Sequence, residues 1–198
     1  MTYSIIGSGA IGGALAKRFA EAGVDALIAN SRGPETLSEI VGASNGRLQA
    51  VPLDEALGAD VVILAVPFDA VSEAVKGAKE WNGRVVVDAT NAIKFPEFKP
   101  ADLQGRASTD IVAEAVPGAR VVKAFNTLPA AVLASDPREG KSTRVVFLSG
   151  NDPDARRVIS SLIFSLKFAP VDLGSIAQSL HLQQFGSPLV GPSFLKQA

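Results

Sequence analysis

A glycine-rich loop near the amino terminus carries the clearest chemical signal. Its residues are Gly7-Ser8-Gly9-Ala10-Ile11-Gly12. This GxGxxG pattern follows a four-residue apolar run and opens an amphipathic segment, the context that gives the pattern meaning. Gly7 permits a tight turn, Gly9 lets the backbone approach a pyrophosphate, and Gly12 allows close packing of helix on strand. The helix start adds free amides and partial positive charge, so we predict that the loop binds a dinucleotide.

The segment after the second apolar run distinguishes between the two nicotinamide dinucleotides. An NAD site places Asp or Glu about 20 residues beyond the loop, where the carboxylate accepts hydrogen bonds from ribose hydroxyls. This chain has Asn30, Ser31 and Arg32 there, without a carboxylate to repel a 2′-phosphate. Arg32 offers a planar fork of donors for phosphate oxygens, and Ser31 adds a hydroxyl. We predict NADP(H); the alternative is a solvated turn with an incidental arginine.

Two further segments follow expected strands. In an open α/β sheet, ligands lie in the crevice outside the carboxyl ends of the strands. Val66 and Pro67 are therefore expected to border the adenosine and ribose path, and Asn91 to approach the nicotinamide ribose. For Val66 and Pro67 the alternative, a simple strand end, stays open.

Acid–base and metal chemistry find little support. The chain has no cysteine and a single histidine, His181, which excludes thiol catalysis and cysteine-ligated zinc and disfavours a histidine metal site. His181 falls in an expected helix over 175–185 and is interpreted as structural or exposed. Asp88 is interpreted as a structural carboxylate, and Lys123 as a solvent-exposed lysine rather than a catalytic acid. We predict neither a catalytic side chain nor a metal site.

Short β-branched runs alternate with helical patterns and must position these residues. The expected strands are Tyr3–Ile6, Ala26–Ala29, Arg47–Val51, Val61–Val66, Arg84–Asp88, Val121–Phe125, Val145–Leu148 and Phe168–Val171. Several are apolar almost throughout, as strands covered on both faces require. Asp152 and Pro153 are typical of an N-cap and first turn for a helix that ends near Leu166. The pattern predicts an α/β fold: a Rossmann-type, doubly wound, mainly parallel sheet of about eight strands with helices on both faces.

The 198 residues predict a single domain, 1–198, with 174–198 as a small helical carboxyl-terminal extension. Thr90–Gln104 and Ala134–Thr143 are expected loops, the first long enough to cover a site. A net charge of −1 and the lack of a basic stretch exclude nucleic acid as a favoured partner. No apolar run reaches the roughly 20 residues of a membrane span, so a cytoplasmic location is expected. The apolar tail Ser187–Leu195 predicts either a homodimer contact or a segment folded over the pocket.

A later segment makes a family resemblance specific: Lys123-Ala124-Phe125-Asn126-Thr127-Leu128. Together with the glycine loop, Asn30–Arg32, Val61–Pro67 and Gly150–Asp152, it resembles the deazaflavin-dependent NADP oxidoreductases. It is also similar to the cytosolic NADPH-binding domain of six-transmembrane metalloreductases. The likeness extends from residue 3 to about residue 185.

The resemblance implies hydride transfer between nicotinamide and a flavin or deazaflavin ring. It implies that Ser31 and Arg32 hold the 2′-phosphate, and that Ala124, Asn126 and Thr127 line the pocket where the rings stack. One position departs from the pattern: many deazaflavin enzymes have a lysine where this chain has Thr36.

Two alternatives remain beside this NADPH-dependent oxidoreductase. One is a small-substrate dehydrogenase of the β-hydroxyacid type, whose site a dimer would complete. The other is a non-catalytic NADP-binding sensor module.

Overall fold

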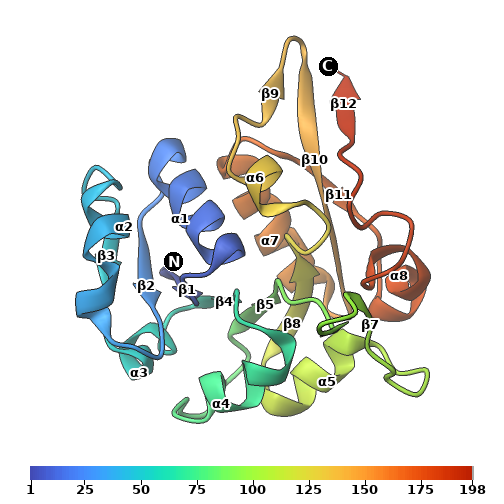
Figure 1. The fold of residues 1–198 in the computed structure, drawn as a ribbon, viewed down its shortest axis with the longest axis horizontal. Helices are drawn as coiled ribbons and strands as arrows, with labels where there is room; N and C mark the ends of the chain where they lie inside the picture. The colour runs from blue at the N-terminus through green and yellow to red at the C-terminus, as the bar shows by residue number, and fades with distance from the viewer. Residues whose placement is uncertain (198) are drawn as a thin grey trace.

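The computed structural model describes residues 1–197, which form one large sheet with helices on both faces and a separate two-stranded hairpin (Figure 1). The strands are β1 (Tyr3–Ile6), β2 (Ala26–Ala29), β3 (Leu48–Ala50), β4 (Val61–Leu64), β5 (Val85–Asp88), β6 (Ile93–Lys94), β7 (Lys99–Pro100), β8 (Arg120–Ala124), β9 (Arg138–Glu139), β10 (Ser142–Gly150), β11 (Ala169–Asp172) and β12 (Leu195–Gln197). The helices are α1 (Ala10–Ala22), α2 (Ser38–Gly42), α3 (Leu53–Ala56), α4 (Val71–Val75), α5 (Ser108–Ala115), α6 (Ala130–Leu133), α7 (Pro153–Ser165) and α8 (Ile176–Gln183), with short 3₁₀ turns η1 (Pro34–Leu37) and η2 (Phe68–Ala70).

The strand order of the large sheet is β11-β10-β8-β5-β4-β1-β2-β3, with β9 and β12 paired to β10 outside this path. Along the path the pairs are parallel except β8–β10, which is antiparallel. The chain builds β1, β2 and β3 in one direction and then returns to place β4 on the other side of β1. The predicted doubly wound, mainly parallel sheet of about eight strands is confirmed, with its switch in strand order between β1 and β4.

The central strands are apolar on both faces because helices cover both faces. Ile5 belongs to one core cluster and the next residue, Ile6, to the other. Val61 and Val62 divide in the same way, as the two-residue period of a strand requires. Helices α1, α2, α6 and α7 cover the Ile5 face, and α3, α4 and α5 cover the Ile6 face (Figure 1).

Local sequence signals set the longer helices. The Asp152 carboxylate accepts a hydrogen bond from the Ala155 amide (2.7 Å), and Pro153 occupies the first turn of α7. Both were predicted as the start of this helix. Ser175 and Gln178 form a capping box at the start of α8. Helix α1 ends at Ala22 and is capped by Gly23, whose φ of +72° is a conformation that glycine adopts without strain.

Two expected loops contain short strands. Residues 90–104 include the β6–β7 hairpin, and residues 134–143 include β9. Two-residue strands leave no alternation for a sequence to display, which is why the pattern missed them.

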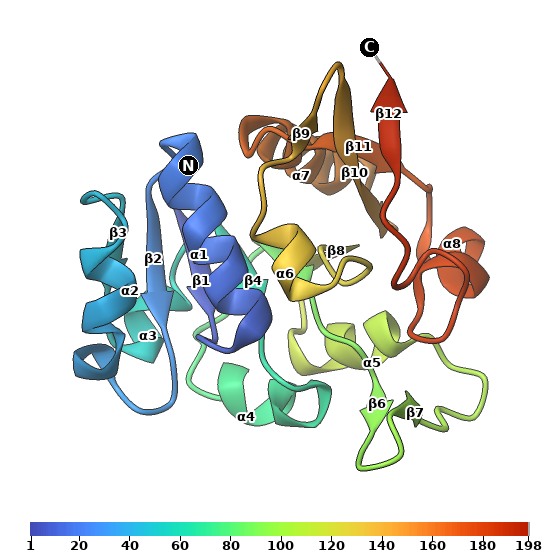
Figure 2. The ribbon, with the colours of Figure 1, turned by 45° about the horizontal axis from the view of Figure 1, so that its top comes forward.

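The carboxyl-terminal extension is helical only in its first part, α8. Residues Leu195–Gln197 form β12, which pairs antiparallel with β10 (Figure 2), so the predicted small helical extension also contains a strand. The tail folds back on its own chain: the Gly191 amide donates to the Thr127 carbonyl (2.8 Å), and the Phe194 ring packs edge-on against Phe147 at 5.5 Å. The pairing partner of β12 lies far away in sequence, so local pattern did not reveal it.

None of the helices in residues 1–197 is both long and apolar enough to cross a lipid bilayer.

Candidate functional site

A cleft lies at the carboxyl ends of β1 and β4, where the strand order switches. It consists of two adjoining cavities. The turn cavity, about 490 Å³, includes Gly7, Ser8 and the Asn30–Arg32 turn in its lining. The hairpin cavity, about 1010 Å³, extends from Gly9 to the β6–β7 hairpin. Gly9, Ala65, Val66, Pro67 and Ala70 line both, so the two cavities form one continuous cleft.

Each of the three glycines of the loop is required for a different structural reason. Gly7 has φ +107°, and a Cβ there would lie 2.4 Å from the Ala65 carbonyl oxygen. A Cβ at Gly12 would lie 2.0 Å from the Gly7 carbonyl oxygen, so this position holds helix against loop. A Cβ at Gly9 would meet no protein atom within 4 Å. Since Gly9 lines both cavities, its missing side chain leaves space for a ligand rather than for the fold.

The start of α1 faces this space with unsatisfied donors. The first intrahelical bond at this end is from the Gly13 amide to the Gly9 carbonyl (2.8 Å), so the preceding amides have no acceptor within the helix. Gly9 provides no capping side chain, and the first turn has no acidic residue. The partial positive charge of the helix start is therefore available to an anion.

Asn30 joins the second turn to the glycine loop. Its Nδ2 donates to Ser8 Oγ (3.0 Å) and to Thr36 Oγ1 (3.0 Å), and its Oδ1 accepts from the Arg32 amide (2.9 Å). Thr36 also donates to the Gly33 carbonyl (2.8 Å), so its hydroxyl stabilises the turn. Within residues 1–197 the exposed Arg32 guanidinium forms no ion pair, which leaves its charge available at the rim of the turn cavity.

Behind the hairpin cavity, a buried amide network connects the lining to α8. Asn91 lines the cavity, and its Nδ2 donates to the Asn126 carbonyl (2.8 Å). Asn126 Nδ2 donates in turn to Asn91 Oδ1 (3.0 Å) and to the Gln183 carbonyl (2.8 Å). The Gln183 Nε2 donates to Asn126 Oδ1 (3.1 Å), and its Oε1 accepts from Ser149 Oγ (2.7 Å). Gln183 thus holds Asn126, which holds Asn91 in the cleft wall.

Asp88 and Lys123 form a buried ion pair next to this network. The Lys123 ammonium lies 2.9 Å from Asp88 Oδ2 and donates to the Thr90 carbonyl (3.2 Å). Thr90 and Thr109 hydroxyls donate to the two Asp88 oxygens at 2.7 and 2.8 Å. Burial raises the pKa of the Asp88 carboxyl, but the Lys123 charge and these hydrogen bonds outweigh it, so the pKa lies below its ordinary value.

The buried ion pair determines the roles of Asp88 and Lys123, the two acid–base candidates from the sequence. Asp88 is a satisfied structural carboxylate, as expected. Lys123 was expected in solvent, and this was wrong: its side chain is only 4% exposed because the Asp88 charge holds it inside. Lys123 is not among the residues that line the cleft. His181 lies exposed in the last turn of α8, as expected.

The structure brings most predicted binding residues to the cleft. Those in its lining are Gly7, Ser8, Gly9, Ala10, Ile11, Asn30, Ser31, Arg32, Val66, Pro67 and Asn91. Gly12 lies behind the loop. Ala124, Asn126 and Thr127 are buried behind the wall rather than in it. Phe125, between them, is fully buried with φ +64°, a strained conformation for a non-glycine residue that surrounding packing must maintain.

Other lining residues carried no motif that identified them. They include Phe68 and Asp69 in η2, and Ile93, Phe95 and Phe98 on the hairpin. The hairpin residues lie in the loop predicted as a cover, but nothing in the sequence showed which side chains face the cleft. A two-residue strand has too short a period to give that information.

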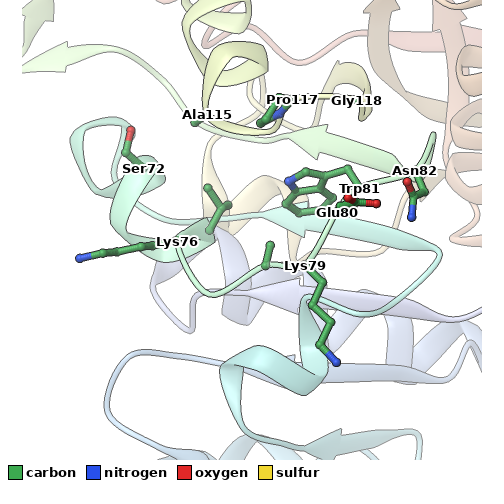
Figure 3. A pocket seen from close by; sticks show the side chains of 11 residues that line it. Ser72, Lys76, Lys79, Glu80, Trp81, Asn82, Ala115, Pro117 and Gly118 are labelled. Carbon is green, nitrogen blue, oxygen red and sulfur yellow. The ribbon is translucent and has the colours of Figure 1, made fainter.

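A third cavity, about 530 Å³, lies near the amino ends of β5 and β8, away from the glycine loop (Figure 3). Trp81 is central to its lining, and Lys76 and Lys79 extend away from that ring. The Arg84 guanidinium stacks on Trp81 at 4.8 Å and donates to main-chain carbonyls, including that of Glu80 (3.1 Å). The cations therefore do not converge on a ligand, and ligands of α/β sheets lie at the opposite strand ends.

Comparisons with known proteins agree with this geometry. Residues 2–92 match the family described as NADP oxidoreductase coenzyme F420-dependent. The chain is 28% identical over 180 residues to metalloreductase STEAP3 of Rattus norvegicus, covering 90% of this chain and 35% of that protein. The chain thus spans about a third of the length of the curated relatives it matches.

Two solved structures share the fold along nearly the whole chain. A hypothetical protein, SMa0349 from Sinorhizobium meliloti, is 59% identical with a TM-score of 0.97, covering 100% of this chain and 96% of that one. A protein from Arthrobacter sp. FB24, described as a putative F420-dependent NADP-reductase, is 24% identical with a TM-score of 0.73, covering 90% of this chain and 87% of that one.

This chain and the Sinorhizobium protein belong to one family. The resemblance to F420-dependent NADP oxidoreductases and to metalloreductases, predicted from the sequence, is confirmed.

Proposed function

We propose that this chain is an NADPH-dependent oxidoreductase that transfers hydride between nicotinamide and a flavin or deazaflavin ring. The observation that carries the proposal is the continuous cleft. One end offers donors for phosphates, and the other is a largely apolar cavity large enough for two stacked rings.

The turn cavity fits the adenosine and phosphate half of NADP(H). The pyrophosphate would lie over Gly9, where a side chain is missing and the amides of the first turn of α1 are free. The 2′-phosphate would meet Ser31 and Arg32, which line this cavity. The nicotinamide half would then enter the hairpin cavity past Val66 and Pro67, toward Asn91.

Bound NADPH supplies a hydride, which the acceptor ring takes up with a proton from solvent to give NADP⁺ and the reduced ring. The chain positions the two rings and excludes water from between them, because hydride transfer between stacked rings needs close, aligned contact. Asn91, held by Asn126 and Gln183, is the polar group of the wall that orients the nicotinamide ribose.

The lining of the hairpin cavity favours this reaction over carbonyl or imine reduction. A small-substrate dehydrogenase needs a positioned acid for the developing oxyanion or amine. Among the described residues that line this cavity there is no lysine, histidine or tyrosine, and Lys123 is committed to Asp88. A ring acceptor that exchanges its proton with solvent does not need such a group.

Anaerobic turnover tests the proposal. We expect NADPH to be oxidised when riboflavin, FMN, FAD or a deazaflavin is present, and to be stable when none is. Tight NADPH binding without turnover on any of these acceptors would instead support the sensor module. Turnover on small ketones or imines alone would support the dehydrogenase.

We also propose that the chain forms a homodimer. Phe194 and Leu195 remain 39% and 41% exposed after the tail has folded back on β10. Exposed large apolar side chains beside a strand at the sheet edge favour association. Light scattering across a range of protein concentrations measures the mass directly, and a monomer at every concentration would contradict the dimer.

A further inference from the structure

The hairpin cavity has an unusual charge balance for a site that receives a coenzyme. Asp69 is the sole charged residue among the described residues that line it. The remainder of the lining is apolar apart from Asn91 and the backbone of the glycine loop. A phosphate-bearing acceptor would therefore find no lysine or arginine in this wall.

The two lysines of the hairpin do not alter this balance. Lys94 and Lys99 are directly opposite each other in the β6–β7 register, so their side chains point to the same face of the hairpin. Ile93 lines the cavity, and the residue next to it in a strand points the other way. Lys94 is also paired with Glu97 at 3.6 Å. Both cations thus lie on the face turned away from the cavity.

An aromatic group forms the lip of the same cavity. Phe95 and Phe98 line it while 67% and 63% exposed, with ring centroids 5.8 Å apart in an edge-to-face arrangement. Phe98 makes a second edge-to-face contact with Phe185 at 5.6 Å, next to α8. The φ of Phe98 is +51°, so the turn holds this large residue in a conformation that side chains rarely adopt. The lip therefore combines a strained backbone at Phe98 with the exposed apolar rings of Phe95 and Phe98.

We propose that the hairpin cavity is the acceptor site and that it takes a planar flavin ring without a phosphate, such as riboflavin, in preference to FMN. This inference rests on the proposed function. The phenyl rings of Phe95 and Phe98 provide a stacking surface for the flavin, and the ribityl chain of riboflavin is neutral. The FMN phosphate carries about −1.5 to −2 charges. In this cavity it would gain no cation, because Asp69 is the sole charged residue among the described residues of the lining. The reaction is NADPH plus riboflavin plus H⁺ to NADP⁺ and reduced riboflavin.

The matched pair of riboflavin and FMN, which differ by one phosphate, tests this directly. At low salt we expect kcat/KM for riboflavin to exceed that for FMN by about fivefold, the size of one weakly screened like-charge contact. Asp69→Asn should reduce the ratio of kcat/KM for riboflavin to that for FMN. Asp110 is an exposed acid on α5, and Asp110→Asn should leave this ratio unchanged. Equal or better use of FMN would overturn the inference and leave the proposed function standing.

Aromatic stacking is tested separately. Phe98→Ala and Phe95→Ala should each raise the KM for riboflavin about tenfold, the usual loss when one stacked ring is removed, without changing NADPH affinity. Phe164→Ala on α7, 72% exposed and outside the cleft lining, is the control. Unchanged KM in both lip variants would overturn the assignment.

If no flavin is reduced, a measurement of riboflavin binding tests this inference independently of the proposed function. Quenching of riboflavin fluorescence by the protein with NADP⁺, weakened by Phe98→Ala, would support the acceptor site while the proposed reaction fails. If riboflavin does not bind and NADPH stays unoxidised with riboflavin, FMN, FAD and deazaflavin, both fail. If riboflavin does not bind but another of these rings is reduced, only this inference fails.

Discussion

Asn91 and Asn126 bond to each other through their side chains, with Asn126 Nδ2 3.0 Å from Asn91 Oδ1. Asn91 lies in the cleft wall, whereas Asn126 is buried behind it. The Gln183 side chain contacts Asn126 from α8, so a helix of the carboxyl-terminal extension is connected to the proposed nicotinamide site by two amide contacts. The extension is therefore expected to affect chemistry in the cleft as well as stability.

Gln183→Leu should reveal this connection. Leucine fills a similar volume but cannot form the side-chain hydrogen bonds of Gln183 with Asn126 and Ser149. Leaving these buried groups without a hydrogen-bond partner should lower the free energy of unfolding by about 1–3 kcal/mol. We expect kcat to fall about tenfold while NADPH affinity at the turn cavity changes little. Gln49→Leu, on the exposed side of β3, is the control. If Gln183→Leu only lowers the melting temperature and kcat is retained, Gln183 has a structural role alone.

The glycine loop predicts opposite effects for two alanine substitutions. Gly9 has φ −74° and no neighbour for a Cβ, so Gly9→Ala should fold normally and lose NADPH affinity. Gly12→Ala places a Cβ 2.0 Å from the Gly7 carbonyl oxygen, so it should destabilise the fold. Calorimetry of binding and thermal unfolding separate the two effects.

Gly13→Ala is the control for both, since its Cβ also meets open space while the position lies within α1. It should leave binding unchanged. Normal NADPH affinity in Gly9→Ala would contradict the placement of the pyrophosphate.

Arg32 is expected to select the cofactor. Arg32→Ala should weaken NADPH binding about 10- to 100-fold, the usual range for a charged hydrogen bond, and leave NADH nearly unchanged. Arg157→Ala, exposed on α7, should affect neither. Equal affinities for NADPH and NADH in the unmodified protein would contradict NADP selection by this turn.

The Asp88–Lys123 pair predicts both a stability loss and an acid dependence. Lys123→Met leaves a buried carboxylate unpaired and should cost about 3–5 kcal/mol. Because the folded-state pKa of Asp88 is lowered, its contribution is complete above the unfolded pKa of about 4 and is lost as the pH falls through the folded pKa.

Urea unfolding between pH 7 and pH 3 measures this dependence. The Asp88→Asn/Lys123→Met double variant should lack the part of the acid dependence that comes from this pair. If the free energy of unfolding changes equally with pH in the double variant and in the unmodified protein, other carboxylates account for the acid dependence.

The sequence was sufficient for the parts of the site that local chemistry determines. The glycine loop, the Asn30–Arg32 turn and Val66–Pro67 follow strands whose apolar runs were plain, and a parallel sheet brings such strand ends together. Asn126 and Thr127 were predicted as lining, but Asn126 lies behind Asn91 and Thr127 is buried, because pattern gives a position along the chain and not its depth in the wall. Gln183 and Phe98 depend on long-range packing of α8 and the hairpin, for which the sequence has no local signal.

Single-turnover mixing under anaerobic conditions tests the central claim most directly. The protein, saturated with NADPH that carries deuterium at C4 of nicotinamide, is mixed with riboflavin while flavin absorbance is followed. We predict bleaching of the flavin, one equivalent of NADP⁺ per flavin reduced, and slower reduction with one of the two C4 deuterium diastereomers. NADPH that remains unoxidised with riboflavin, FMN, FAD and deazaflavin alike would contradict hydride transfer to a flavin-type ring.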